Sequence, residues 1–203
     1  MAMSMRATPF RTIVTLARHE SRAMAAVAVI AAAGVVASLA IESGPSGVLA
    51  ADLLLVVTAI AVIDGRSFII PDELNAAGIV LGLAYAGLTE PSVTDGLMLA
   101  ALRGGIVALA FLAIRSCYRR LRGRDGLGLG DVKLAAMAGV WLDWTMIPIA
   151  IDIAAGAALA AYGLRQLAVG RAVRSTGRLP FGLFFAPAIW LGWALGRWLM
   201  VGG

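Results

Sequence analysis

The chain has 203 residues, of which 61% are hydrophobic and 14% are charged, and its formal net charge is +5. A soluble domain carries roughly 25% charged residues, so this composition excludes an ordinary soluble protein and predicts an all-α, polytopic membrane helical bundle. The basic residues, all arginine except Lys133, cluster between apolar runs. That pattern is typical of cytoplasmic loops and argues against a nucleic-acid-binding surface. A single cysteine, Cys117, and a single histidine, His19, exclude an internal disulfide and a four-ligand Cys/His zinc site.

Seven apolar runs predict about seven transmembrane helices, a six-helix core with one additional N-terminal helix. Their approximate ranges are 24–41, 48–63, 74–89, 97–117, 131–143, 146–164 and 182–199. The first run could also be part of a cleaved signal peptide. It is longer than the apolar region of most signal peptides, about 7–15 residues, and this favours a membrane anchor.

The distribution of arginines predicts which loops face the cytoplasm. Arginines precede the first run and recur in residues 115–124 and 165–178, whereas the loops "ESGPSG" and "TEPSVTD" contain none. Basic loops remain on the cytoplasmic side, so residues 131–164 must cross the membrane an even number of times. We therefore predict a hairpin of two helices there, with "LDWT" at the outer turn, and not one long broken span.

Two aspartates occupy the same predicted depth on different helices. Asp64 ends the second apolar run and Asp131 opens the fifth, both at the cytoplasmic edge. Ionisable groups in or beside a membrane are costly and are candidates for function. The structural alternatives are that Asp131 caps a helix and that Asp64 is an interfacial residue ending a span. Two carboxylates a few ångströms apart cannot both ionise easily, so such a pair can serve as base and acid toward water.

Glycines precede the second aspartate. Gly128 and Gly130 flank Leu129, and glycine allows turns closed to other residues as well as close approach of another backbone. An extended substrate segment could pair beside such a loop. The alternative is a flexible inner loop ahead of a helix.

Three segments together resemble the type IV prepilin peptidases. They are "IDGRSFIIPDELN" from Ile63, "GLGLGDVKLAAMAGVWLDW" from Gly126 and "RLPFGLFFAPA" from Arg178. The resemblance extends in order and spacing over about residues 48–200. It implies a GxGD membrane aspartyl endopeptidase that cleaves the leader peptide of type IV prepilins or pseudopilins at the cytoplasmic face of the bacterial inner membrane. Residues 1–23 would then form a cytoplasmic N-terminal segment and residues 24–203 the transmembrane peptidase domain.

The resemblance also assigns roles to residues. Asp64 and Asp131 correspond to the catalytic pair, and neither a metal nor a cofactor is implied. Supporting or substrate-binding roles are implied for the other motif positions, Pro71, Asp72, Gly128, Gly130, Lys133, Pro180, Phe181 and Gly182. The expected partners are prepilin or pseudopilin substrates and membrane lipid, with no nucleic acid; the substrate's identity and the oligomeric state stay open.

The sequence departs from the family pattern in two places. Bifunctional members carry an N-terminal insert with paired CxxC motifs and methylate the cleaved pilin; residues 1–23 contain no cysteine, so we expect the short, peptidase-only form without S-adenosylmethionine. The third motif also reads Phe-Gly-Leu where many members have Phe-Gly-Pro.

Two alternative functions are a presenilin-like GxGD intramembrane protease and a small proton- or ion-coupled transporter that uses Asp64, Asp131 and Asp152.

Other polar residues are expected to have structural roles. Asp152, within the sixth run, is expected to bond a neighbouring helix or, second, to support the catalytic pair. Asp52 and Arg103 are expected either to pair or to extend separately toward the outer surface, and Glu42 to be solvated in an outer loop. A belt at the outer interface is predicted for Trp141, Trp144, Trp193 and Trp198.

Overall fold

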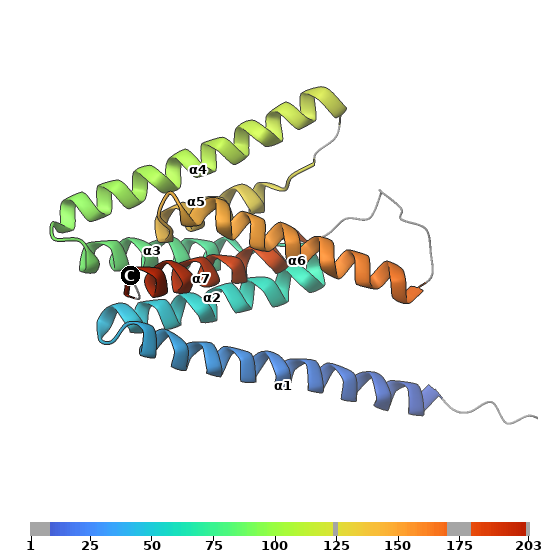
Figure 1. Ribbon diagram of the computed structural model, residues 1–203. Coiled ribbons are helices and arrows are strands. Elements are labelled where there is room, and N and C mark those ends of the chain that lie inside the picture. Colours follow the sequence, from blue (N-terminus) through green and yellow to red (C-terminus); the bar gives the residue numbers. More distant parts are fainter. Residues whose placement is uncertain (1–8, 124–125, 170–179, 202–203) are drawn as a thin grey trace, which may run out of the picture.

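The computed structural model describes residues 9–123, 126–169 and 180–201, and these residues form helices and no strand. The helices are α1 (Pro9–Ile41), α2 (Pro45–Ser67), α3 (Asp72–Thr89), α4 (Val93–Arg122), α5 (Leu129–Trp141), α6 (Met146–Val169) and α7 (Phe181–Val201) (Figure 1). Each predicted run coincides with one of these helices, so the predicted all-α bundle is confirmed. Residues 1–8, most of the predicted basic loop after α6, and Arg178 at the start of the third motif lie outside the described residues.

The first helix is longer than its apolar run. It begins at Pro9 and continues to Ile41, because no glycine or proline interrupts the chain between Pro9 and Gly34. Its apolar part is Ser21–Ile41. The basic residues in front therefore extend the same helix, and the backbone has no break at residues 23 and 24.

Among the described residues, five helices are long and apolar enough to cross a membrane, and they lie within α1, α2, α4, α6 and α7. The chain is thus a polytopic helical membrane protein. Helix α5 has only 13 residues, about 20 Å at 1.5 Å per residue, which is shorter than a hydrocarbon core of about 30 Å. The chain reverses direction between α5 and α6 (Figure 1), so the predicted hairpin is confirmed in place of one broken span.

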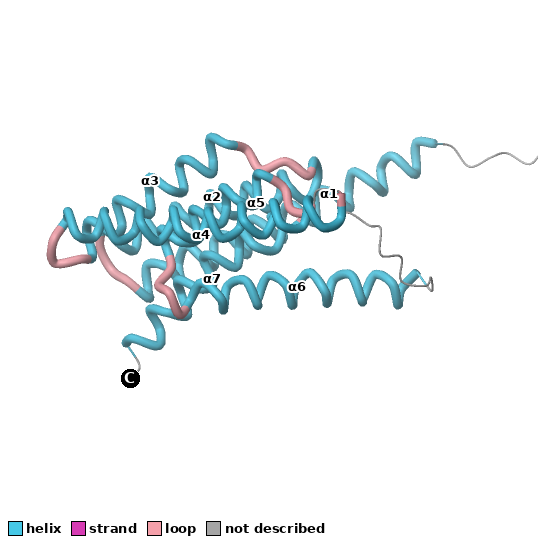
Figure 2. Tube along the Cα trace, turned by 90° about the horizontal axis from the view of Figure 1, so that it is seen from above, coloured by secondary structure: helices cyan, strands magenta, loops and turns pink. Residues whose placement is uncertain are grey.

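The centre of the bundle is formed by α2, α3, α5 and α7, while α1 packs on α2 and α6 packs on α7. Seen from above, α6 lies along one side of the other helices (Figure 2). The buried core combines large side chains of α2, α5 and α7: Leu53, Val57, Ile60, Leu134, Met137, Phe185 and Ile189. Helices α4 and α5 approach especially closely, since a Cβ on Gly139 would lie 2.8 Å from the Arg103 carbonyl oxygen.

The bundle has two ends of different character. At the Asp64 end, α2 ends and α3, α5 and α7 begin; at the Glu42 end, α1, α3 and α7 end and α2 begins. All three sequence motifs therefore meet at the Asp64 end, because the antiparallel course of the helices returns the chain there each time (Figure 1).

Candidate active site

Asp64 lies in the last turns of α2 and is only 5% exposed. Its Oδ2 accepts a hydrogen bond of 2.9 Å from the backbone N–H of Leu183, near the start of α7. The first N–H groups of a helix have no acceptor within the helix, and that end carries partial positive charge. The buried carboxylate is therefore held by the N-terminus of a helix that is distant in sequence.

Asp131 lies in the first turn of α5 and is half-buried. Its Oδ2 accepts a hydrogen bond of 3.0 Å from the backbone N–H of Gly128. The N-cap residue of α5 is Gly128, so the expectation that Asp131 might itself occupy the N-cap is wrong. Its carboxylate nevertheless takes part in capping the helix, and this contact fixes its direction relative to the loop.

Ile70 connects the elements that carry the two aspartates. A Cβ on Gly130 would lie 3.1 Å from the Ile70 Cβ, and a Cβ on Gly182 would lie 2.9 Å from both the Ile70 Cδ1 and the Asp64 Oδ2. The buried Ile70 side chain thus touches the starts of both α5 and α7 beside Asp64. Because Asp131 directly follows Gly130, the Ile70 side chain places the start of α5, the start of α7 and the Asp64 carboxylate around it at the same end of the bundle.

The glycines of the second motif serve close approach and not an unusual turn. Gly128 has a φ of −72°, and among the described glycines only Gly44 and Gly123 have positive φ. The expectation of a turn closed to other residues is therefore wrong here. Close approach does occur, with the Ile70 side chain of the same chain against Gly130.

Asp72 and Lys133 form an ion pair at the edge of the site. The Lys133 Nζ lies 2.6 Å and 2.7 Å from the two Asp72 carboxylate oxygens, and both side chains are largely exposed. The preceding Pro71 is the N-cap of α3, and its carbonyl accepts the Asn75 N–H. Because these contacts join the first turns of α3 and α5, Asp72 and Lys133 orient the motif helices and do not point at Asp64.

Pro180 and Phe181 place the start of α7. Pro180 immediately precedes the helix, and Phe181 is its first residue. The Phe181 ring lies 5.1 Å from that of Phe185, which stacks at 5.9 Å on Phe111 of α4. This row of rings anchors the helix end whose N–H groups face Asp64.

Three contributors to the site were missed by the sequence reasoning. Arg115 of α4 donates to the carbonyl of Leu127 in the glycine loop that precedes Asp131. Asn75 is buried and donates to the Lys133 carbonyl at 3.1 Å. An arginine early in the basic cluster and an asparagine within an apolar run were the available signals. Leu183 makes its contact through the backbone N–H, so its side chain offered no signal in the sequence.

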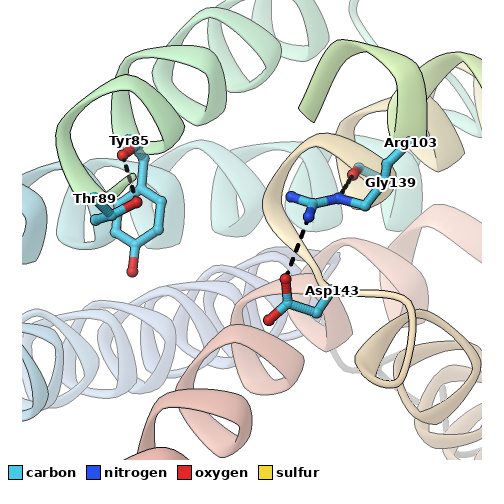
Figure 3. A network of polar contacts seen from close by, with 5 residues as sticks. All are labelled: Tyr85, Thr89, Arg103, Gly139 and Asp143. Carbon is cyan, nitrogen blue, oxygen red and sulfur yellow. Dashed lines mark hydrogen bonds and ion pairs between the residues drawn. The ribbon is translucent and has the colours of Figure 1, made fainter. Parts of the chain in front are cut away.

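The Glu42 end contains charges that pair with one another. Glu42 accepts hydrogen bonds from the Tyr85 hydroxyl at 2.7 Å and from Arg197 at 3.0 Å, so the expectation of a solvated loop residue is wrong. Arg103 pairs with Asp143 at 3.3 Å and donates to the Gly139 carbonyl (Figure 3). It therefore pairs with the α5–α6 turn and not with Asp52.

A cavity of about 210 Å³ lies between these charged groups. It is lined by the last turn of α3, the α5–α6 turn and the last turns of α7, because the short α5 ends before its neighbours do.

The predicted tryptophan belt holds only in part: Trp144 and Trp198 are exposed, whereas Trp141 and Trp193 are buried in the core. The Trp141 indole N–H donates to the Gly78 carbonyl at 2.8 Å.

Asp152 is exposed on α6, so it joins neither the aspartate pair nor a neighbouring helix of the described chain. Within residues 9–123, 126–169 and 180–201, no group of three or more His, Cys, Asp or Glu residues is arranged to hold a metal ion.

The described fold and site define a class: an all-helical, multi-pass membrane protein with two carboxylates at one end of the bundle. The pattern of the type IV leader peptidase family matches residues 51–164, and the chain belongs to that family. No solved structure shows a significant match.

Curated relatives carry leader peptidase names. The chain is 39% identical over 147 residues to a prepilin leader peptidase/N-methyltransferase of Burkholderia pseudomallei, a match that covers 70% of this chain and 45% of that protein. It is 33% identical over 126 residues to the leader peptidase HopD of Escherichia coli, covering 62% of this chain and 78% of HopD. The HopD of Salmonella typhimurium is 30% identical over 136 residues, covering 66% and 84% of the two chains. The chain therefore spans less than half of the Burkholderia relative and most of HopD.

Proposed function

We propose that this protein is an aspartic endopeptidase that removes the leader peptide of type IV prepilins or related pseudopilins at the cytoplasmic face of the bacterial inner membrane. Asp64 and Asp131 are the catalytic residues, and Pro71, Asp72, Gly128, Gly130, Lys133, Pro180, Phe181 and Gly182 position them or the substrate. The peptidase site lies within residues 24–203, with residues 1–23 on the cytoplasmic side.

The two aspartates share one proton, so that one carboxyl is protonated and the other is ionised. The ionised carboxylate takes a proton from a water molecule while the water oxygen bonds to the carbon of the scissile amide. The protonated carboxyl gives its proton to the carbonyl oxygen. When the resulting gem-diol collapses, the C–N bond breaks, the proton first taken from water passes to the leaving amine, and one gem-diol hydroxyl returns its proton to the carboxylate that had given one. The products are a leader peptide with a new carboxyl end and a pilin with a free amine.

The observation that carries this proposal is the meeting of the three motifs around Ile70. A pair of carboxylates on separate helices, each fixed by a backbone N–H at the same end of the bundle beside Ile70, is suited to such proton sharing. A proton or ion pathway is less well supported, because Asp152 lies exposed on α6 and not in line with the pair.

The test of mechanism compares purified Asp64→Asn, Asp131→Asn and the double variant on one prepilin substrate. Each single change should lower turnover by at least about 100-fold, and the double change should be no worse, because members of one catalytic unit are not additive. Asp72→Asn and Asp152→Asn serve as controls and should retain substantial activity. Near-normal turnover by a well-folded Asp131→Asn protein would refute the aspartic mechanism.

The proposed orientation has its own test. In a Cys117→Ser background, cysteines replace Leu121, which is 77% exposed among the arginines of the last turn of α4, and Glu90, which is exposed between α3 and α4. An impermeant thiol reagent added to intact cells should label the Glu90 position and leave the Leu121 position unlabelled until the membrane is opened. The reverse pattern would place the Asp64 end outside the cell.

A further inference from the structure

The short connection between α2 and α3 contains the one described non-glycine residue with positive φ. Phe68 has a φ of 56° and a ψ of 33°, the left-handed region that a bulky side chain rarely occupies. A glycine would adopt this conformation freely. Strain of this kind persists where the surrounding structure enforces it, and it is concentrated at functional sites.

The strained corner is fixed on both sides. The Phe68 N–H donates to the Asp64 carbonyl at 2.9 Å, and Ile70, two residues further on, is buried at the contact with the Gly130 and Gly182 positions. Pro71 then caps α3. Phe68 and Ile69 are therefore held in place although their side chains are 55% and 62% exposed.

Exposure of apolar side chains is ordinary on the lipid-facing surface of this bundle, and Ile114 and Leu102 are examples on a regular helix. Lipid contact requires no particular backbone conformation. A phenylalanine kept in a left-handed conformation four residues after Asp64, beside an exposed isoleucine, indicates instead that this side chain has a defined position relative to the carboxylates.

We propose that Phe68 and Ile69 contact the substrate, forming the apolar surface against which an apolar segment beside the cleaved bond aligns across Asp64 and Asp131. The inference rests on the proposed peptidase function and assigns to these two side chains the binding of that apolar segment. The buried Ile70 on one side and the C-cap hydrogen bond of Phe68 to the Asp64 carbonyl on the other set their position.

The experiment uses purified full-length protein in detergent and one prepilin substrate. Phe68→Gly removes the ring and relieves the strain, so the thermal midpoint should not fall and should rise by about 2 °C. Loss of the apolar contact should raise KM by about 10-fold with kcat within about 2-fold of the original. Phe68→Tyr keeps the ring and should keep KM near that of the unchanged protein. Ile69→Ala should raise KM by about 3-fold.

Ile114→Ala, at an exposed apolar position of α4 toward the same end, is the matched lipid-facing control and should leave KM unchanged. An unchanged KM in Phe68→Gly, or an equal rise in Ile114→Ala, would overturn the inference, the latter in favour of lipid contact. If Phe68→Gly fails to fold, Phe68→Tyr and Ile69→Ala decide by the same measurement. Asp64→Asn is assayed in parallel. If this variant stays active, the proposed peptidase mechanism is wrong. If it is inactive while Phe68→Gly has the KM of the unchanged protein, only the inference about Phe68 and Ile69 is wrong.

Discussion

At the Glu42 end of the bundle, carboxylates are held by cations and hydroxyls: Glu42 by Arg197 and Tyr85, and Asp143 by Arg103. At the Asp64 end, Asp64 and Asp131 are held by backbone N–H groups. Paired charges contribute mainly to stability, because their partners satisfy them in the resting fold. Two neighbouring carboxylates are costly in the resting fold and useful in proton transfer. The two ends should therefore respond differently to substitution, one in stability and the other in activity.

The largest effect is expected at Gly182. The Cβ of a Gly182→Ala variant would lie 2.9 Å from the Asp64 Oδ2, so the carboxylate or the start of α7 must move. A displacement of about 1 Å at a reacting group can cost about 100-fold in rate, and we expect a loss of that size in kcat/KM. Gly156→Ala on α6 is the control, since nothing lies within 4 Å of its Cβ. Equal activity of the two variants would contradict the close contact that defines the site.

A stability effect is expected from Glu42→Gln. The change removes the charge that Arg197 and Tyr85 share, while keeping the size of the side chain. Hydrogen bonds to charged groups contribute about 1.5–3 kcal/mol, so we expect the thermal midpoint in detergent to fall by about 5 °C. The kcat of the folded fraction should stay within about 2-fold, because the site lies at the other end. Glu90→Gln, at an exposed carboxylate nearby, is the control; a large fall in kcat for Glu42→Gln would mean that the two ends are coupled.

A smaller effect is expected at the Arg103–Asp143 pair. The Arg103 side chain is 18% exposed and that of Asp143 is 50% exposed, so solvent screens the pair in part. A double-mutant cycle with Arg103→Gln and Asp143→Asn should give a coupling free energy of about 1 kcal/mol in thermal unfolding. Activity should be unaffected. A coupling near zero would show that the Gly139 carbonyl is the more important partner of Arg103.

The smallest effect is expected at the Lys133–Asp72 pair, where the side chains are 47% and 68% exposed. The cycle of Lys133→Gln and Asp72→Asn should give at most about 0.5 kcal/mol, and added salt should reduce it further. Turnover should change by no more than about 3-fold. A loss comparable to that of Asp64→Asn would make one of these residues part of the chemistry and would remove the distinction between pairing and catalysis at this end.

Much of the architecture follows from the sequence alone. The seven apolar runs define the helices because a lipid environment demands long apolar segments with internally paired backbone groups. The same patterning indicated the break at Asp143, since only a hairpin keeps the flanking basic segments on one side. The order of the motifs along alternating helices also predicts that Asp64 and Asp131 lie at the same end. Local periodicity carries this information, and each helix can be recognised without its neighbours.

The contacts between helices that are distant in sequence were decided only by the tertiary structure. The sequence could not show that the Leu183 N–H binds Asp64, that Gly130 and Gly182 both receive Ile70, or that Arg115 reaches the Leu127 carbonyl. Glu42 looked like a solvated loop residue, and its burial depends on where Tyr85 and Arg197 arrive. Hydropathy reports how deep a residue lies along a helix. It does not report which way the helix is rotated about its axis, and only packing against the other helices determines that rotation.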